Sequence, residues 1–354
     1  MSSKHDAADP RAAIAAADEA LSAALDARAT AVRELLEYRR LHADTYVPMT
    51  DDASIIRQAR ERAQSFPAAE VEAVFREILG ATASLEAERR VAHCGGGFAE
   101  LAARRHFGHA ATLVCFSDVE AVIEQVVSGR AAFGVLPLET SSDGAVTATL
   151  NGLATSEVSI CAERTLAAEY HLLSQTGNAA DVEKVYGPAP ALAAAERYLL
   201  TNFPRATLLD VPSLHVAAEL ALTDHGAAAL GVDLDECAGL RTLAESVQDE
   251  RDRQTRFAIV GRELPSRTGR DRTVIALAVG DRPGALHAIL APFADRAINL
   301  TRLESRPARR SGIRYRFFVE MDGHLTDRSI VTALDRVRDL CPVVKVLGSY
   351  PRPD

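Results

Sequence analysis

The stretch TRFAIVGRELPSRTGRDRTVIALAVG, residues 255–280, separates two domains of different architecture. It opens with a hydroxyl and a guanidinium, Thr255 and Arg256, ahead of an apolar run that is typical of a buried strand. Residues 262–270 are polar and rich in breaker residues, which predicts a linker. The second apolar run, residues 273–280, begins a new series of elements.

That series predicts a C-terminal domain over residues 271–354. After the strand at 273–280 we expect a helix, two strands, a helix and a strand, at residues 284–296, 298–307, 312–323, 327–340 and 343–350. This βαββαβ order is the ferredoxin-like split motif, so the sequence predicts an α+β domain.

Residues 91–263 alternate between short β-rich runs and amphipathic helices. Apolar runs such as 112–116 and 131–138 are followed by helical patterns, for example at 118–128 and 191–200. The alternation predicts mostly parallel sheets with helices on their faces. A region of about 170 residues suits two α/β lobes with a ligand-binding cleft between them.

Residues 1–90 form a third predicted domain, which is helical throughout. Apolar residues recur at helical spacing, and no proline interrupts residues 11–46. A short helix with Thr50 or Asp51 as its N-cap and a third helix over residues 68–90 follow. Because three helices in about 80 residues bury little core unaided, we expect dimerisation through the long helix.

The composition limits the classes of function. The chain has 354 residues, of which 47% are apolar and 25% charged, as expected of a globular protein with two or three domains. A net charge of -9 argues against nucleic-acid binding, which needs a basic face. The sequence contains no apolar run of 18 or more residues, so it predicts no membrane-spanning helix. The N-terminus lacks the apolar core of a signal peptide. The five scattered cysteines form no CxxC pair, so we expect a cytoplasmic protein with reduced thiols and no metal site.

Two C-terminal motifs carry a family resemblance. Gly284-Ala285-Leu286 follows Arg282-Pro283, and Asn299-Leu300 precedes Glu304-Ser305-Arg306-Pro307. In this order after Thr255-Arg256-Phe257, they resemble the end of a prephenate dehydratase domain followed by an ACT regulatory domain. The resemblance implies that the Gly-Ala-Leu turn and the Glu-Ser-Arg-Pro loop bind a small amino acid, phenylalanine, at a domain interface.

The middle region resembles the prephenate dehydratase catalytic domain, a two-lobed fold similar to periplasmic binding proteins. Residues 134–144, GVLPLETSSDG, match the family loop GVxPxENSxEG, and the histidine of EYHLLS matches one on its central strand. The resemblance implies that Thr255 assists departure of the ring hydroxyl while prephenate loses CO2, without a metal or organic cofactor. The residues implied to be catalytic are Thr255, Glu139, Ser141 and His171, and those implied to bind substrate are Thr140, Arg256 and Phe257.

Other segments of this region depart from the family pattern. The family's GPxGTFS segment appears as Cys94–Ala99 without its hydroxyls, and its SHPQ loop appears as Gly187-Pro188-Ala189-Pro190. The asparagine two positions before the family's catalytic threonine is Arg253 here.

The N-terminal helices resemble the all-helical chorismate mutase domain that is fused to bacterial prephenate dehydratases. At 100° per residue, Arg28 and Arg39 lie within about 20° of each other, whereas Arg11 is about 100° away. The resemblance implies that Arg11, Arg28, Arg39 and Glu86 bind chorismate, with Thr82 in the serine position and Arg11 reaching the partner subunit's site. The short helix lacks the family's Asp-x-x-Arg-Glu pattern, so we expect low mutase activity unless Arg57 or Arg60 compensates.

These resemblances predict a bifunctional chorismate mutase/prephenate dehydratase that acts on chorismate and prephenate. We expect regulation by phenylalanine and assembly as a homodimer or homotetramer. The alternative is a divergent paralogue that has lost or altered one or both activities, and that senses an aromatic ligand or acts on a cyclohexadiene acid. The retained Thr255, Glu139, Ser141 and His171 favour the first reading, and the missing cleft hydroxyls and the missing short-helix arginine favour the second.

Overall fold

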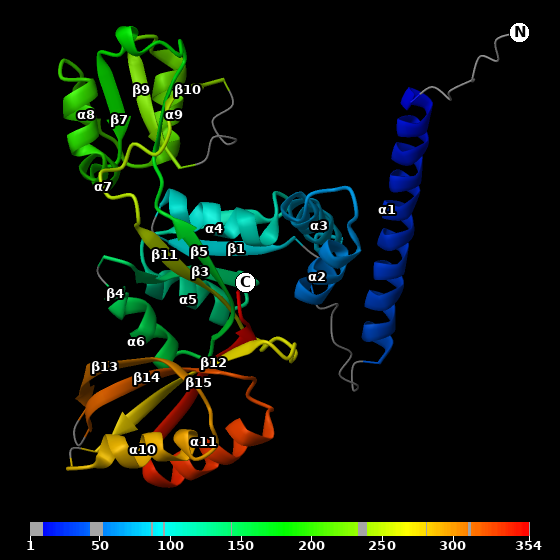
Figure 1. Cartoon of the computed structure of the whole chain (residues 1–354), viewed down its shortest axis with the longest axis vertical. Helices are drawn as coiled ribbons and strands as arrows, with labels where there is room; N and C mark the ends of the chain where they lie inside the picture. Colours follow the sequence, from blue (N-terminus) through cyan, green and yellow to red (C-terminus); the bar gives the residue numbers. More distant parts are fainter. Residues whose placement is uncertain are drawn as a thin grey trace, which may run out of the picture. The chain divides into compact units, whose positions relative to one another are not determined.

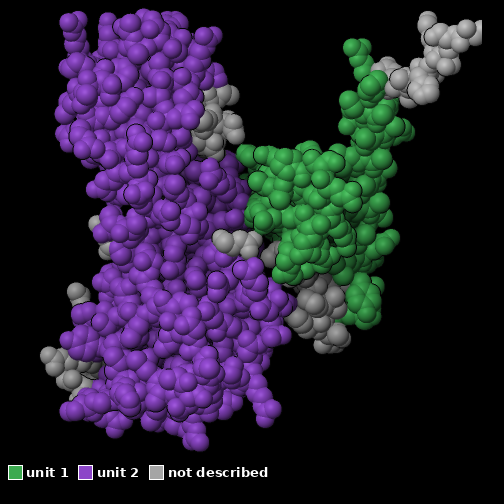
Figure 2. All heavy atoms as spheres, in the orientation of Figure 1, with its two compact units in different colours: residues 1–89, 107–112 green, residues 90–106, 113–354 purple. Residues whose placement is uncertain are grey.

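The computed structural model describes residues 10–42, 52–85, 88–94, 96–142, 144–232, 239–280, 282–310 and 313–353. The chain divides into two compact units, residues 1–89 with 107–112, and residues 90–106 with 113–354 (Figure 2). Among the described residues, none of the helices is both long and apolar enough to cross a membrane.

The first unit is helical, as the sequence predicts. It contains α1 (Pro10–Leu41), α2 (Asp52–Arg62) and α3 (Ala68–Ala83). The last of these ends earlier than expected, and the predicted N-cap residues Thr50 and Asp51 lie outside the described residues. Helix α1 spans 32 residues, which corresponds to roughly 48 Å. It leaves several large apolar side chains exposed, including Ile14, Leu21, Leu25, Tyr38 and Leu41.

The second unit contains two sheets (Figure 1). The larger sheet has ten strands in the order β13-β14-β12-β15-β5-β11-β3-β1-β2, with β4 paired to β3. Its strands are β1 (Arg90–Cys94), β2 (Thr112–Phe116), β3 (Phe133–Thr140), β4 (Gly144–Ala145), β5 (Ser159–Ala167), β11 (Gln254–Gly261), β12 (Asp271–Val279), β13 (Leu300–Arg310), β14 (Ile313–Asp322) and β15 (Val343–Pro351). Helices α4 (Gly97–Phe107), α5 (Val119–Val127) and α6 (Thr147–Thr155) connect its first strands.

The smaller sheet belongs to a second lobe, residues 168–253, while residues 90–167 and 254–261 form the first lobe. Its five strands run in the order β10-β6-β9-β7-β8. They are β6 (His171–Ser174), β7 (Lys184–Gly187), β8 (Thr207–Asp210), β9 (Ala227–Gly231) and β10 (Arg241–Ala244), with η1 (Ala179–Asp181), α7 (Ala189–Ala194), α8 (Glu196–Asn202) and α9 (Leu214–Thr223). The helix predicted at 191–200 is divided at Ala195, because the Asp249 carboxylate accepts from the backbone N–H groups of Arg197 and Tyr198 and begins α8 separately.

The two lobes are joined by strands that run in opposite directions, so the expectation of mostly parallel sheets is wrong for the centre of the larger sheet. Strand β1 is parallel to β3, but β11 is antiparallel to both β3 and β5. The chain leaves the first lobe after β5 and returns to it as β11. The returning strand inserts between β5 and β3, which forces the antiparallel pairing.

The C-terminal domain, residues 271–353, has the predicted ferredoxin-like order. Strand β12 is followed by α10 (Ala285–Ala294), β13, β14, α11 (Arg328–Leu340) and β15. Helices α10 and α11 pack on one face of its sheet, where Ile275, Leu277 and Phe293 are buried. The other face packs on the first lobe, in a core shared by Val274, Ala276, Phe318 and Tyr350 with Leu136, Leu150, Leu153 and Ala258. The two domains are therefore fastened through a common apolar core.

One backbone contact joins the two halves of the ten-stranded sheet. Strand β15 lies parallel to β5, with Gly348 opposite Ile160. A Cβ atom on Gly348 would lie 2.5 Å from the Ile160 carbonyl oxygen and 2.7 Å from its Cβ. Glycine therefore permits this approach.

We expect Gly348→Ala to lower the unfolding free energy of the second unit by about 1–3 kcal/mol, because the methyl group forces β15 away from β5. Urea denaturation followed by circular dichroism measures the change. Gly280→Ala is the control, since no heavy atom lies within 4 Å of its added Cβ. Equal denaturation midpoints for the two variants would contradict the prediction.

Candidate functional site

The pairing of β3 with β11 brings together residues that the sequence motifs single out. Thr255 lies opposite Thr140, and Arg256 lies opposite Glu139. Because side chains alternate along a strand, the two threonines point to one face and the Glu139–Arg256 pair points to the other. We call these the hydroxyl face and the charged face.

The hydroxyl face carries two of the predicted site residues, Thr140 and Thr255, and Ser141 lies at its end. Ser141 follows Thr140, and its N–H donates to the Gln254 carbonyl at 2.9 Å. The Ser141 Oγ in turn accepts from the Gln254 N–H at 3.0 Å. Phe257, two residues beyond Thr255, is buried. The end of β3 is thus held against β11 beside the Thr255 hydroxyl.

His171 belongs to the second lobe, at the start of β6. It is buried, and its Nδ1 accepts from the Ser246 N–H at 3.4 Å. The preceding Tyr170 packs edge-on against Phe98 of α4, with ring centroids 5.1 Å apart. This ring contact ties the beginning of β6 to the first lobe, although His171 and Thr255 lie in different sheets.

A concavity of about 410 Å³ lies in the second lobe where β7 and β8 end. The two strands are parallel, and the carboxyl ends of parallel strands are a frequent place for ligands. The concavity is lined by Pro188, Ala189, Pro190, Asp210, Val211 and Pro212. The sequence motif at Gly187–Pro190 therefore forms part of an open hollow, whose Asp210 carboxylate accepts from the Ala189 N–H at 2.8 Å.

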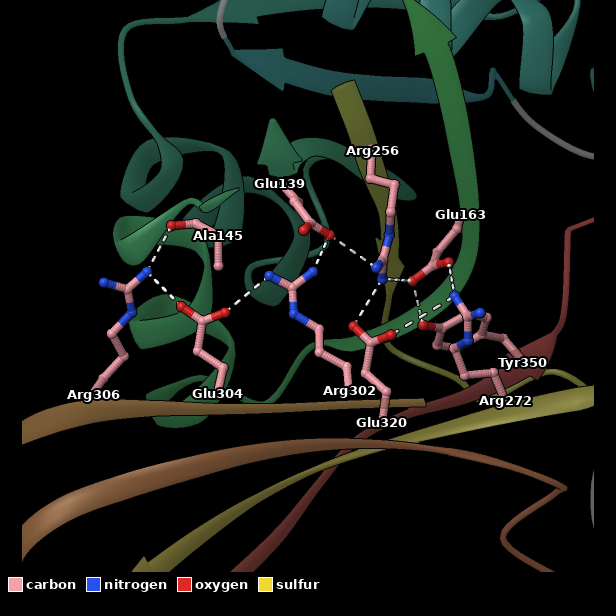
Figure 3. Close-up of polar contacts among 10 residues, drawn as sticks. All are labelled: Glu139, Ala145, Glu163, Arg256, Arg272, Arg302, Glu304, Arg306, Glu320 and Tyr350. Carbon is pink, nitrogen blue, oxygen red and sulfur yellow. Dashed lines mark hydrogen bonds and ion pairs between the residues drawn. The ribbon is translucent and has the colours of Figure 1, made fainter. Parts of the chain in front are cut away.

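The charged face is an ion-pair network centred on Arg256 (Figure 3). Its guanidinium lies 3.0 Å from Glu139, 2.7 Å from Glu163 and 2.8 Å from Glu320. The last two carboxylates are almost fully buried. Burial opposes the charge on Arg256, but the attraction of Glu163 and Glu320 outweighs it and raises the pKa of Arg256. The group is therefore permanently cationic.

Two further side chains of the C-terminal domain complete this network. The Arg272 guanidinium lies 2.7 Å from Glu163, and the Tyr350 hydroxyl donates to Glu163 at 2.6 Å. Burial, followed by the nearby carboxylates of Glu163 and Glu320, raises the pKa of Tyr350 well above its usual value, so it remains a donor. Sequence reasoning missed these residues. The available signal was the presence of Glu163 and Glu320 beside apolar residues of two predicted strands, where a buried charge requires a partner.

Arg256, which we expected to bind substrate, faces the C-terminal domain rather than the hydroxyl face. Since three carboxylates engage its guanidinium, this geometry does not support direct substrate binding. Glu139 lies on the same charged face, where it pairs with Arg256 and with Arg302 of β13.

The predicted effector residues lie at the two ends of the segment from α10 to β13. Gly284 precedes α10 with a φ of +78°, a left-handed conformation that favours glycine. Ala285 is buried and Leu286 half-buried. The Asn299 amide donates to Asp322 at 2.9 Å, just before Leu300 begins β13.

The Glu304-Ser305-Arg306-Pro307 motif lies within β13, in agreement with the strand predicted at residues 298–307 and in contrast to the loop that the family resemblance implies. It pairs with β14 along its length, which gives its backbone a regular ladder. Alternation places Arg302, Glu304 and Arg306 on the face toward the first lobe. Ser305 and Pro307 are exposed.

In the helical unit, the structure brings Arg28 and Thr82 together. The Arg28 guanidinium donates to the Thr82 hydroxyl, which donates to the Ile78 carbonyl at 2.5 Å. Glu86 and the side chain of Arg39 lie outside the described residues. Arg11 is exposed and 17 positions from Arg28, or roughly 26 Å along the helix. One copy of α1 therefore cannot direct both arginines at one small ligand.

The short helix α2 contains the two arginines that could compensate for the missing family arginine. Arg57 is exposed, while Arg60 lies 3.5 Å from Glu72 of α3. The described residues contain no group of three or more His, Cys, Asp or Glu side chains placed to hold a metal ion.

Three family models match the chain in order. Residues 10–87 match chorismate mutase type II, residues 94–265 match prephenate dehydratase, and residues 273–339 match the ACT domain. These matches support the three-domain architecture, although the dehydratase and ACT regions form one compact unit.

Proteins and solved structures that carry these domains are similar to this chain along most of their own length. A bifunctional chorismate mutase/prephenate dehydratase of Stutzerimonas stutzeri is 36% identical over 287 residues, covering 80% of this chain and 79% of that protein. A protein of the same description from Neisseria gonorrhoeae is 33% identical over 344 residues, covering 93% and 95%. The solved prephenate dehydratase from Arthrobacter aurescens in complex with L-Phe is 34% identical, with a TM-score of 0.63, covering 74% of this chain and 90% of that one. The chain therefore belongs to the family of bifunctional chorismate mutase/prephenate dehydratases.

Proposed function

We propose that this chain carries out two consecutive steps of phenylalanine biosynthesis, the rearrangement of chorismate to prephenate and the decarboxylating dehydration of prephenate to phenylpyruvate. The helical domain (residues 1–90) would perform the first step, the two-lobed domain (91–263) the second, and the ACT domain (271–354) would sense phenylalanine. The family assignment supports both activities. The observation that carries the proposal is the placement of Thr255 beside Thr140 and Ser141 on the hydroxyl face.

Dehydration of prephenate needs a hydrogen-bond donor at the leaving oxygen and a firm hold on the substrate. The bond between the ring and its carboxylate breaks and releases CO2, and its electron pair enters the ring. The hydroxyl on the ring carbon para to the carboxylate leaves and becomes water with one proton that comes from solvent. In this proposal Thr255 donates to the departing oxygen, Thr140 and Ser141 orient the substrate, and His171 adds a polar group from the second lobe. Aromatisation drives the reaction.

Glu139 and Arg256 have a supporting part in this mechanism. Both lie on the charged face, where their side chains pair with each other at 3.0 Å. They hold β3 and β11 together immediately behind Thr140 and Thr255. We assign them to positioning of the hydroxyl face.

The mutase site is built from two copies of the chain in this proposal. Arg28 and Thr82 form one part of it, and Arg11 of the partner copy reaches it because it lies too far along α1 in the same copy. The large apolar side chains that α1 exposes, such as Ile14 at 62% and Leu41 at 71%, support a second helix covering this surface. A homodimer or homotetramer in the cytoplasm is the assembly that we propose.

The divergent-paralogue alternative is not favoured. The relatives that match most of the chain carry the bifunctional description, and Thr255 stands in the register that the proposed mechanism requires. The absence of the family's hydroxyls at Cys94–Ala99 is the observation that fits a sensor as well as an enzyme.

Thr255→Val tests the dehydratase proposal. Valine keeps the branched shape and removes the donor, so we expect phenylpyruvate formation from prephenate to fall by roughly 100-fold or more. Thr255→Ser is the control, since it keeps the hydroxyl and should retain much of the rate. Wild-type turnover in the valine variant would exclude Thr255 as the donor.

Arg28→Met tests the mutase site. Losing a charged contact to chorismate should lower chorismate consumption by on the order of 100-fold, while dehydration of added prephenate continues. Arg33→Met, an exposed arginine on the same helix, should change neither rate. If both variants convert chorismate equally fast, Arg28 does not bind it.

Gly284→Val tests phenylalanine binding. Any non-glycine residue at this φ of +78° is strained, and moving the turn should weaken phenylalanine affinity by about tenfold or more. Gly269→Val imposes the same kind of strain in the linker, where φ is +90°, and should leave the affinity unchanged. Titration calorimetry on the full chain measures both. Absence of heat with wild type at millimolar phenylalanine would refute the ACT proposal itself.

A further inference from the structure

Strand β13 of the C-terminal domain contacts the first lobe at both ends of the segment Glu139–Ala145. The Arg302 guanidinium pairs with the Glu139 carboxylate at the beginning of the segment. The Arg306 guanidinium donates to the Ala145 carbonyl at 3.0 Å, at the end of the segment. Between these two contacts lie Thr140 and Ser141, the residues of the hydroxyl face.

Glu304 links the two arginines to each other. Its carboxylate lies 2.9 Å from Arg302 and 2.6 Å from Arg306 (Figure 3). The three side chains come from every second residue of β13 and lie on the same face. The Cα atoms of Arg302 and Arg306 are therefore about 13 Å apart along the strand. All three are less than a third exposed, which reduces screening of their charges by solvent.

Electrostatic balance shows why Arg302 matters for Glu139. Arg256 is shared by Glu139, Glu163 and Glu320, two of which are nearly buried. Without Arg302, Glu139 would depend on a guanidinium that already serves two other carboxylates, and it would feel their repulsion. The segment that follows Glu139 would then move away from β11.

We propose that Arg302 is a positioning residue for the dehydratase reaction, which with Arg306 clamps the Glu139–Ala145 segment from the ACT domain. This inference rests on the proposed function of the hydroxyl face. The clamp lies on the strand that carries the predicted effector residues Glu304 and Arg306. A displacement of β13 by phenylalanine therefore reaches Thr140 and Ser141 directly, and sensitivity to phenylalanine depends on the same two contacts.

The test compares Arg302→Met, Arg302→Lys and Lys345→Met in the full chain. Lys345 is the matched control, because its ammonium also crosses from the C-terminal domain to the first lobe, where it donates to the carbonyls of Leu153 and Ser156. It does not contact the Glu139–Ala145 segment through these bonds. A misplaced site of this kind loses about 10- to 100-fold in rate.

We expect Arg302→Met to lower kcat by about 10- to 100-fold with KM changed less than about threefold, and to reduce inhibition by phenylalanine. Arg302→Lys should recover part of kcat, because a lysine can pair with Glu139 but lacks the fork that also reaches Glu304. Lys345→Met should keep kcat and the phenylalanine response. Wild-type kcat in Arg302→Met, or an equal loss in Lys345→Met, would overturn the proposal.

Hydrogen exchange gives a readout that does not require turnover. The Ser141 N–H donates to Gln254 and the Val146 N–H donates to Leu138 at 2.9 Å, so both report the position of the segment. Their exchange should accelerate at least tenfold in Arg302→Met and remain unchanged in Lys345→Met. Unchanged exchange in Arg302→Met refutes the clamp. Failure of the wild type to make phenylpyruvate would instead refute the proposed function.

Discussion

Arg256 carries a largely buried positive charge that carboxylates from two domains neutralise. Glu139 and Glu163 come from the first lobe, and Glu320 comes from the C-terminal domain. Removing one partner of such a network would leave buried charges uncompensated, which typically costs about 3–5 kcal/mol. The shared apolar core and the contact between β15 and β5 act at the same boundary. The dehydratase and ACT regions therefore hold together as one compact unit.

Because side chains alternate along a strand, the hydroxyl face proposed for catalysis and the charged face that contacts the ACT domain lie on opposite sides of the sheet. Adjacent residues of one motif, Thr255 and Arg256, point to opposite faces of β11. We propose that the first acts on the substrate, and the second connects the strand to the ACT domain through Glu320. Thr255 and Arg256 are neighbours in the backbone of β11. We therefore infer that a change in the ion-pair network around Arg256 reaches the hydroxyl face directly.

The helical unit differs from the second unit in the contacts that complete its proposed site. Its contact between Arg28 and Thr82 lies within one copy, whereas the roles that we propose for Arg11 and for the exposed apolar side chains of α1 involve a second copy. A long helix with large exposed apolar residues gains its stability from a partner rather than from its own core. In the proposed mechanism the mutase site therefore needs a second copy, whereas the residues proposed for dehydration all come from one chain.

The sequence by itself determined the order of the three domains, the βαββαβ pattern and the motif residues, because helical periodicity, strand runs and breaker residues are local signals. It did not determine the antiparallel insertion of β11 or the parts of Glu163, Arg272, Arg302 and Tyr350. These residues meet partners that lie 93 to 187 positions away in the chain, as Arg256 does with Glu163 and Tyr350 with Glu163. From the sequence we expected both Thr255 and Arg256 to act on the substrate, whereas the packing of the ACT sheet on the first lobe places carboxylates around Arg256. Local patterns record what each segment can form, and the tertiary structure decides which charges must be buried together.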